Sequence, residues 1–109
     1  MHPEVEKLAN LIQEASTLLL THGEKSWGDR LRVDAQRVRS LDFYGVEHML
    51  SAFGGMGSIN DLVLSPMNGH NIEEKDVASA NKKIQNLLGR IYEVAKKLAK
   101  EEANATKDT

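Results

Sequence analysis

The sequence predicts an all-α protein, an antiparallel bundle of about four helices. Three observations favour this class: apolar side chains recur every three or four residues in four segments, no segment alternates with period two, and one glycine-rich stretch separates the third segment from the last. A chain of 109 residues forms one domain with a modest core. We therefore expect a single helical domain over residues 1–103 and a frayed tail over residues 104–109.

The first two segments are amphipathic. The first should begin at Pro3, which suits the first turn of a helix, and end near Gly23, which suits its C-terminal stop. For the second segment, Ser26 is the expected N-cap. The apolar face of that second segment consists of Trp27, Leu31, Ala35 and Val38.

The third segment is short and the fourth is long. The third should open at Leu41 or Asp42 and end at the glycines Gly54 and Gly55. The fourth should run from about Ile72 to Glu102, with Asn71 and Glu74 forming a capping box. Its apolar stripe consists of Val77, Ala80, Ile84, Leu87, Ile91, Val94 and Leu98.

This last helix suggests self-association. At 1.5 Å per residue it would be about 45 Å long, whereas the first helix offers only about 27 Å to cover it. Gly89 lies in its middle, where glycine costs about 1 kcal/mol relative to alanine, so we expect another backbone to approach there, from this chain or from a second copy. We predict a homodimer through the C-terminal half of this helix, which carries Val94 and Leu98, with burial against the first helix as the alternative.

Composition and charge narrow the function. A net charge of −2 gives no electrostatic basis for binding nucleic acid or an anionic membrane surface. No apolar run reaches membrane-spanning length, so we expect a cytoplasmic protein. The absence of cysteine excludes disulfides, thiolate catalysis and cysteine-ligated metals. The four histidines lack the spacing of a helical zinc site, and we expect no metal and no cofactor.

The most informative stretch runs from Gly54 to Ile72. Its 19 residues carry one formal charge, Asp61, in a protein whose composition is 28% charged. Loops are usually polar and exposed. The apolar side chains of this stretch should therefore be buried, either in the core or by a partner. We expect Leu62 and Leu64 in the core, and the two methionines at the surface. The candidate binding residues are Trp27, Gly54, Gly55, Met56, Gly57, Ser58, Asn60, Asp61 and Met67.

The glycine-rich part of this stretch has two interpretations. Glycines allow backbone N–H groups to converge on an anion, so Gly54 to Ser58 could cradle a phosphate. The lysine of a Walker loop is missing, however, and a helix rather than a strand precedes the glycines. The alternative is a tight structural reversal. Asn60 and Asp61 could cap a short helix, or Asp61 could be a buried acid among apolar neighbours.

The phrase Phe53-Gly54-Gly55-Met56-Gly57-Ser58-Ile59-Asn60-Asp61-Leu62 resembles a family of short, uncharacterised bacterial proteins with a Phe-Gly-Gly-Met-Gly-Ser-x-Asn-Asp-Leu motif. The resemblance covers roughly residues 27–64. It implies a small bacterial domain and brings no activity or catalytic residue with it.

Three classes of function remain. The leading one is a non-enzymatic protein-binding module, for example an immunity or antitoxin-type inhibitor whose partner is a toxin. The second is a small-ligand or anion-binding protein that uses the Gly54–Asp61 loop. The third is an enzyme, for which the sequence offers only Asp61, His48 and Tyr44.

Overall fold

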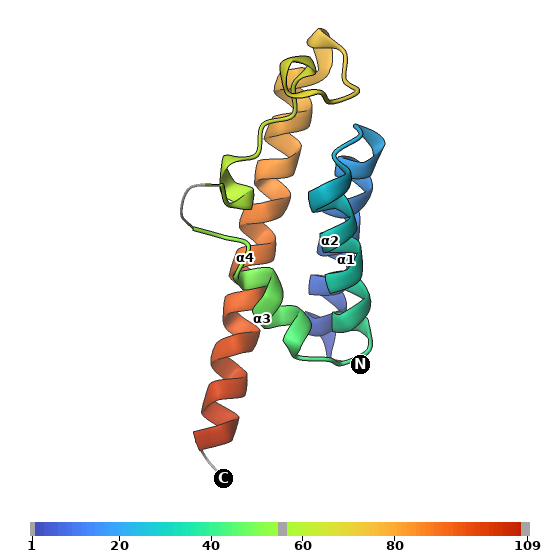
Figure 1. Cartoon of the computed structure of the whole chain (residues 1–109). Coiled ribbons are helices and arrows are strands. Elements are labelled where there is room, and N and C mark those ends of the chain that lie inside the picture. The colour runs from blue at the N-terminus through green and yellow to red at the C-terminus, as the bar shows by residue number, and fades with distance from the viewer. Residues whose placement is uncertain (1, 55–56, 108–109) are drawn as a thin grey trace.

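The described residues, 2–54 and 57–107 of the computed structural model, form an all-α protein without strands. Helices α1 and α2 form an antiparallel pair, the short α3 follows, and the long α4 runs the length of the molecule beside them (Figure 1). The four-helix prediction is confirmed. The helices are α1 (Pro3–Thr21), α2 (Lys25–Arg39), α3 (Tyr44–Leu50) and α4 (Val77–Lys107), with short 3₁₀ turns at Ile59–Asp61, Pro66–Asn68 and Glu74–Asp76.

The turn between α1 and α2 differs in one detail from the prediction. Helix α1 begins at Pro3 as expected, and Gly23 follows it with a φ of +78°. The N-cap of α2, however, is Glu24 and not Ser26. The Glu24 carboxylate accepts a hydrogen bond of 2.8 Å from the Trp27 N–H. The helix therefore begins at Lys25, and Ser26 lies inside its first turn.

Helix α3 is shorter than its apolar pattern. The helix begins at Tyr44 with Phe43 as its N-cap, later than the predicted start at Leu41 or Asp42, and the Asp42 carboxylate accepts the Tyr44 N–H at 3.1 Å. The helix ends at Leu50, and the chain then turns until it reaches Gly54. From Gly57 onward the segment follows the flank of α4 to the end at which α4 begins (Figure 1).

Helix α4 starts later and continues further than predicted. The prediction of a capping box formed by Asn71 and Glu74 is wrong. The Asn71 N–H instead donates to the His22 carbonyl at 2.8 Å. A 3₁₀ turn precedes the helix, which begins at Val77 and extends to Lys107, past the predicted helix end at Glu102. Of the described helices, none combines the length and the apolar content needed to cross a bilayer.

The core corrects the argument for a dimer. Val94 and Leu98 are only 7% and 6% exposed, so this chain already covers the stripe that we assigned to a second copy. The N-terminal end of α1 reaches this part of α4, where Glu4 lies 3.7 Å from Lys97. Helix α3 and the segment after it cover much of the α4 surface that α1 does not contact. The stripe therefore provides no reason for self-association.

The long loop contributes to this core. Ile59 and Leu64 are fully buried, which confirms the prediction for Leu64. Leu62 is only partly buried against the core, and Met67 is 95% exposed, as expected. The Asn81 amide fixes Leu64 by bonding both its N–H and its carbonyl at 2.8 Å. The loop is thus an integral layer of the fold, and Met56 lies outside the described residues.

Candidate functional site

Side chains of the glycine-rich motif bond the backbone of two of its glycines. Gly54 and Gly57 have φ values of +86° and +77°, a region that glycine occupies without strain. The Asn60 side-chain oxygen accepts the Gly54 N–H at 3.2 Å, and the Asp61 carboxylate accepts the Gly57 N–H at 3.1 Å. This explains why the glycines and the Asn-Asp pair occur together in the sequence. The glycines adopt the positive φ angles, and the Asn60 and Asp61 side chains accept hydrogen bonds from the glycine N–H groups.

These bonds bear on the anion-cradle interpretation. The N–H groups of Gly54 and Gly57 that an anion would use already donate to the loop's own side chains. One of the two acceptors is the carboxylate of Asp61, whose negative charge would repel a phosphate. Asp61 is exposed and so is not a buried acid, and it accepts from Gly57 rather than from the N–H groups of the turn that follows. Gly55 lies outside the described residues.

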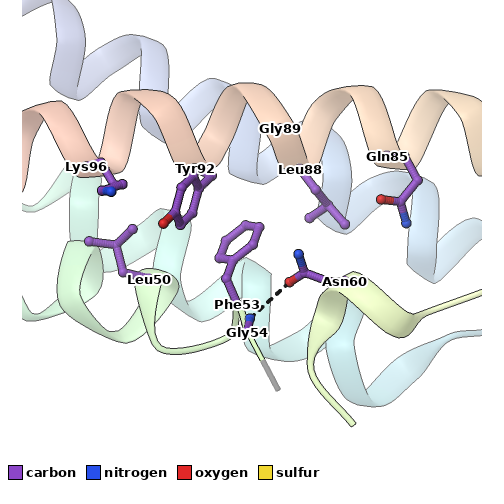
Figure 2. Close-up of a pocket in the computed structure, with 9 residues that line it drawn as sticks. All are labelled: Leu50, Phe53, Gly54, Asn60, Gln85, Leu88, Gly89, Tyr92 and Lys96. Atoms are coloured by element: carbon purple, nitrogen blue, oxygen red, sulfur yellow. Dashed lines mark hydrogen bonds between the residues drawn. The ribbon is translucent and has the colours of Figure 1, made fainter. Parts of the chain in front are cut away.

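Beside this loop, a groove of about 520 Å³ separates the end of α3 from α4. Its α4 wall is a stripe at helical spacing, and its opposite wall comes from α3 and the loop (Figure 2). The lining is mainly apolar and aromatic. The lining residues are Leu50, Phe53, Gly54, Asn60, Gln85, Leu88, Gly89, Tyr92 and Lys96.

Two aromatic rings build the central part of the groove. Phe53 and Tyr92 have ring centroids 5.1 Å apart with planes tilted by 57°, a favourable aromatic geometry. Phe53 packs partly against the core, while Tyr92 is 38% exposed. In Figure 2 the Phe53 ring points from the loop side toward α4. The pair therefore joins the two walls and leaves an apolar surface accessible beside it.

Gly89 lies on the α4 wall, and no described residue approaches it. A Cβ atom built there would meet nothing within 4 Å, apart from its two neighbours in the chain and the backbone of its own helix. For the described residues, the expectation that another backbone of this chain packs on Gly89 is therefore wrong. Gly89 lines the groove on α4 near Leu88 and Tyr92 without adding a side chain to it (Figure 2).

Polar groups lie at the two ends of the groove. The amides of Asn60 and Gln85 flank one end, and Lys96 lies at the other, close to Tyr92 (Figure 2). The Lys96 ammonium is 5.3 Å from the Tyr92 ring centroid, within the range of a cation–π contact. An apolar middle with a few polar groups is the usual composition of a binding site.

The structure brings together only part of the predicted site. Gly54 and Asn60 line the groove, whereas Trp27 and Met67 do not. Trp27 packs partly against the core under the Arg30 guanidinium, 5.1 Å from its ring. Apart from Gly89, the α4 wall was not predicted from the sequence, although a glycine in the middle of a strongly patterned helix was the signal that could have located it.

Two of the three residues considered for catalysis, His48 and Tyr44, lie on α3 beside α2. His48 bonds Asp34, a fully buried carboxylate on α2, with Nδ1 at 2.8 Å and 3.0 Å from its two oxygens. Arg37 donates to the same carboxylate at 3.2 Å. Tyr44 stacks on the His48 ring at 5.6 Å. In the described part of the chain, no three acidic or histidine side chains gather as a metal site would require.

Comparison with known proteins finds one family. Residues 20–73, just under half of the chain, match a family model described as Domain of unknown function (DUF6966). The matched segment runs from the last turn of α1 to the residue before the 3₁₀ turn that precedes α4, and it contains the glycine-rich motif. No curated protein and no solved structure matches the chain. The chain is therefore similar to this family over α2, α3 and the loop.

Proposed function

We propose that this chain is a non-enzymatic binding module and that the groove between the Gly54–Asp61 loop and α4 receives a segment of a partner protein. The observation that carries this proposal is Gly89. Glycine in the middle of a helix costs about 1 kcal/mol relative to alanine, and nothing in the described chain takes up the space it leaves. A residue that destabilises the free protein at a groove is explained by a partner that must approach the helix closely.

The size and lining of the groove support the same function. Its volume of about 520 Å³ falls within the range of ligand sites. Binding energy at protein interfaces concentrates in well-packed pockets that receive large side chains, and the surface beside Phe53 and Tyr92 is of that kind. The α4 wall from Gln85 to Lys96 spans about 16 Å at 1.5 Å per residue, which favours an elongated occupant.

The alternative, a small ligand or anion held by the Gly54–Asp61 loop, has less support. Its donors at Gly54 and Gly57 are engaged by Asn60 and Asp61, so an anion would first have to displace these side chains. A small apolar ligand in the groove is the stronger form of this alternative. The identity of the partner as a toxin stays a prediction, and the genes that neighbour this one would test it. A second copy of the chain is another candidate partner.

Site-specific photocrosslinking in the native cells tests the proposal. The photoreactive residue p-benzoylphenylalanine is introduced in place of Gln85 on the groove wall, and, as a matched control, in place of the exposed Lys83 on the same helix. We expect a protein adduct from the Gln85 position that the Lys83 position does not give. Adding Gly89→Leu, which fills the groove, should abolish the adduct.

Three outcomes separate the candidates. An adduct that persists in the presence of Gly89→Leu would contradict the groove as the site. Equal adducts from both positions would show nonspecific contact and would also count against it. A mass increase of small-molecule size at the Gln85 position, without a protein adduct, would favour the small-ligand alternative. An adduct of twice the chain's 12.1 kDa would identify a second copy as the partner.

A further inference from the structure

The groove also indicates the chemistry of its occupant. Among its lining residues, the only formally charged side chain is Lys96. Its ammonium is placed over Tyr92 at 5.3 Å, so the positive charge lies against the aromatic part of the groove. Because complementary charges across an interface set specificity, the occupant should present an anionic group at this end.

The opposite end offers a hydrogen-bond donor of fixed direction. The Gly54 N–H can only donate, and it lies 3.2 Å from the Asn60 side-chain oxygen. The amide nitrogen of Asn60 therefore faces the other way, toward α4, between Phe53 and Leu88 (Figure 2). That nitrogen is a donor, and its partner in an occupied groove is an acceptor such as a carbonyl oxygen.

We propose that the occupant is an acidic, apolar peptide segment of a partner protein: a carboxylate pairs with Lys96, a carbonyl accepts from Asn60, and a bulky apolar side chain lies between Phe53 and Gly89. This inference rests on the proposed function. The distance of about 16 Å between the ends of the α4 wall corresponds to about five residues of extended chain at 3.3 Å each. A small carboxylic acid that reaches Lys96 alone would leave the Asn60 end unused.

Selection from a displayed library of random peptides tests this specificity. Peptides are selected on the intact wild-type chain, and peptides that also bind the groove-filled Gly89→Leu variant are discarded. We expect the remaining sequences to share an Asp or Glu near an aromatic or large aliphatic residue. Repeating the selection on Lys96→Glu should replace the acidic preference with Lys or Arg. The control Lys83→Glu, an equal charge change at an exposed position outside the groove, should leave the acidic preference intact.

A matched substitution tests the Asn60 donor. Asn60→Asp keeps an oxygen to accept the Gly54 N–H but removes the donor that faces the groove. It should weaken binding of a selected acidic peptide by about tenfold or more. The carboxylate of the variant would face the peptide carbonyl without a hydrogen to donate, and its negative charge would repel the acidic peptide. Thermal unfolding should show that the variant remains folded, which separates this effect from loss of the loop.

The results distinguish the two levels of the proposal. If the wild type and Gly89→Leu select the same peptides, the groove is not a binding site and the proposed function fails. If groove-dependent peptides are selected but carry no acidic residue, or if Lys96→Glu does not change their charge, the further inference fails alone. If Asn60→Asp binds such a peptide as well as the wild type does, the assigned role of Asn60 is wrong.

Discussion

His48 on α3 and Asp34 on α2 are joined by a hydrogen bond of 2.8 Å, and Asp34 is fully buried. This hydrogen bond joins the two helices directly and positions α3, which contributes Leu50 to the wall of the groove opposite α4. The His48 side chain remains 28% exposed, so its ring connects the buried carboxylate to the surface. Arg37 provides the second partner of that carboxylate.

The first prediction follows from this pairing. His48→Ala leaves the buried Asp34 carboxylate with its bond to Arg37 but without its bond to the imidazole, and should lower the free energy of unfolding by roughly 1–3 kcal/mol. Adding Asp34→Asn removes the poorly compensated charge, so the double variant should recover part of that loss. Urea unfolding of the wild type, both single variants and the double variant checks this. A loss in the double variant equal to the sum of the two single losses would show that the two side chains do not depend on each other.

The second prediction compares two glycines whose surroundings are equally open. A Cβ atom added at Gly54 or at Gly89 would meet no atom of another described segment within 4 Å, yet alanine should have opposite effects at the two positions. Gly54 has a φ of +86°, so Gly54→Ala should destabilise by about 1–2 kcal/mol. Gly89 is in a regular helix, so Gly89→Ala should stabilise by about 1 kcal/mol.

Chemical unfolding midpoints of these two variants provide the measurement. Circular dichroism should show the same helical content for both, which excludes a gross change of fold as the cause. If Gly89→Ala destabilises the protein, a neighbour must approach Gly89 after all, and the open groove would be in doubt.

The third prediction concerns the long loop. Leu64 is fully buried, so Leu64→Ala should cost about 2–5 kcal/mol, whereas Met67→Ala should change stability by less than about 0.5 kcal/mol because Met67 is 95% exposed. Leu62→Ala should fall between them, since Leu62 is partly buried. Thermal unfolding of the three variants ranks them. A Leu64→Ala variant as stable as the wild type would show that the loop does not belong to the core.

The fourth prediction concerns the apolar stripe of α4. Because Leu98 is 6% exposed within the single chain, Leu98→Glu should destabilise the fold by more than about 2 kcal/mol rather than produce a stable monomer. The control is Lys100→Glu, which places the same side chain at an exposed position nearby. Light scattering and circular dichroism on the same samples separate dissociation from unfolding. A helical, stable monomer from a dimeric parent would restore the stripe as a dimer interface.

Much of the fold could be predicted because apolar periodicity is a local signal. The faces of α1, α2 and α4 follow from three- and four-residue spacing, and Pro3 marked the start of α1 correctly. The caps were less predictable, because several adjacent polar residues could serve. Glu24 rather than Ser26 caps α2, and that choice depends on where the preceding turn places the chain.

The site was only half predictable, for a different reason. The loop residues Gly54 and Asn60 were found because their composition is unusual and their partners lie within a few residues. The α4 wall is separated from them along the chain and becomes part of the site only after folding. The Asp34–His48 bond likewise joins residues on different helices, and nothing in the spacing of the sequence pairs them.

The most direct test of the central claim is the affinity of the partner captured by crosslinking for the wild type, Gly89→Ala and Gly89→Leu, measured by calorimetry beside the stability of each free protein. We predict that Gly89→Ala stabilises the free chain and yet weakens binding, and that Gly89→Leu abolishes binding while the chain stays folded. Such opposite changes are expected only if the glycine makes room for the partner. Unchanged affinity in the folded Gly89→Leu variant would contradict the account.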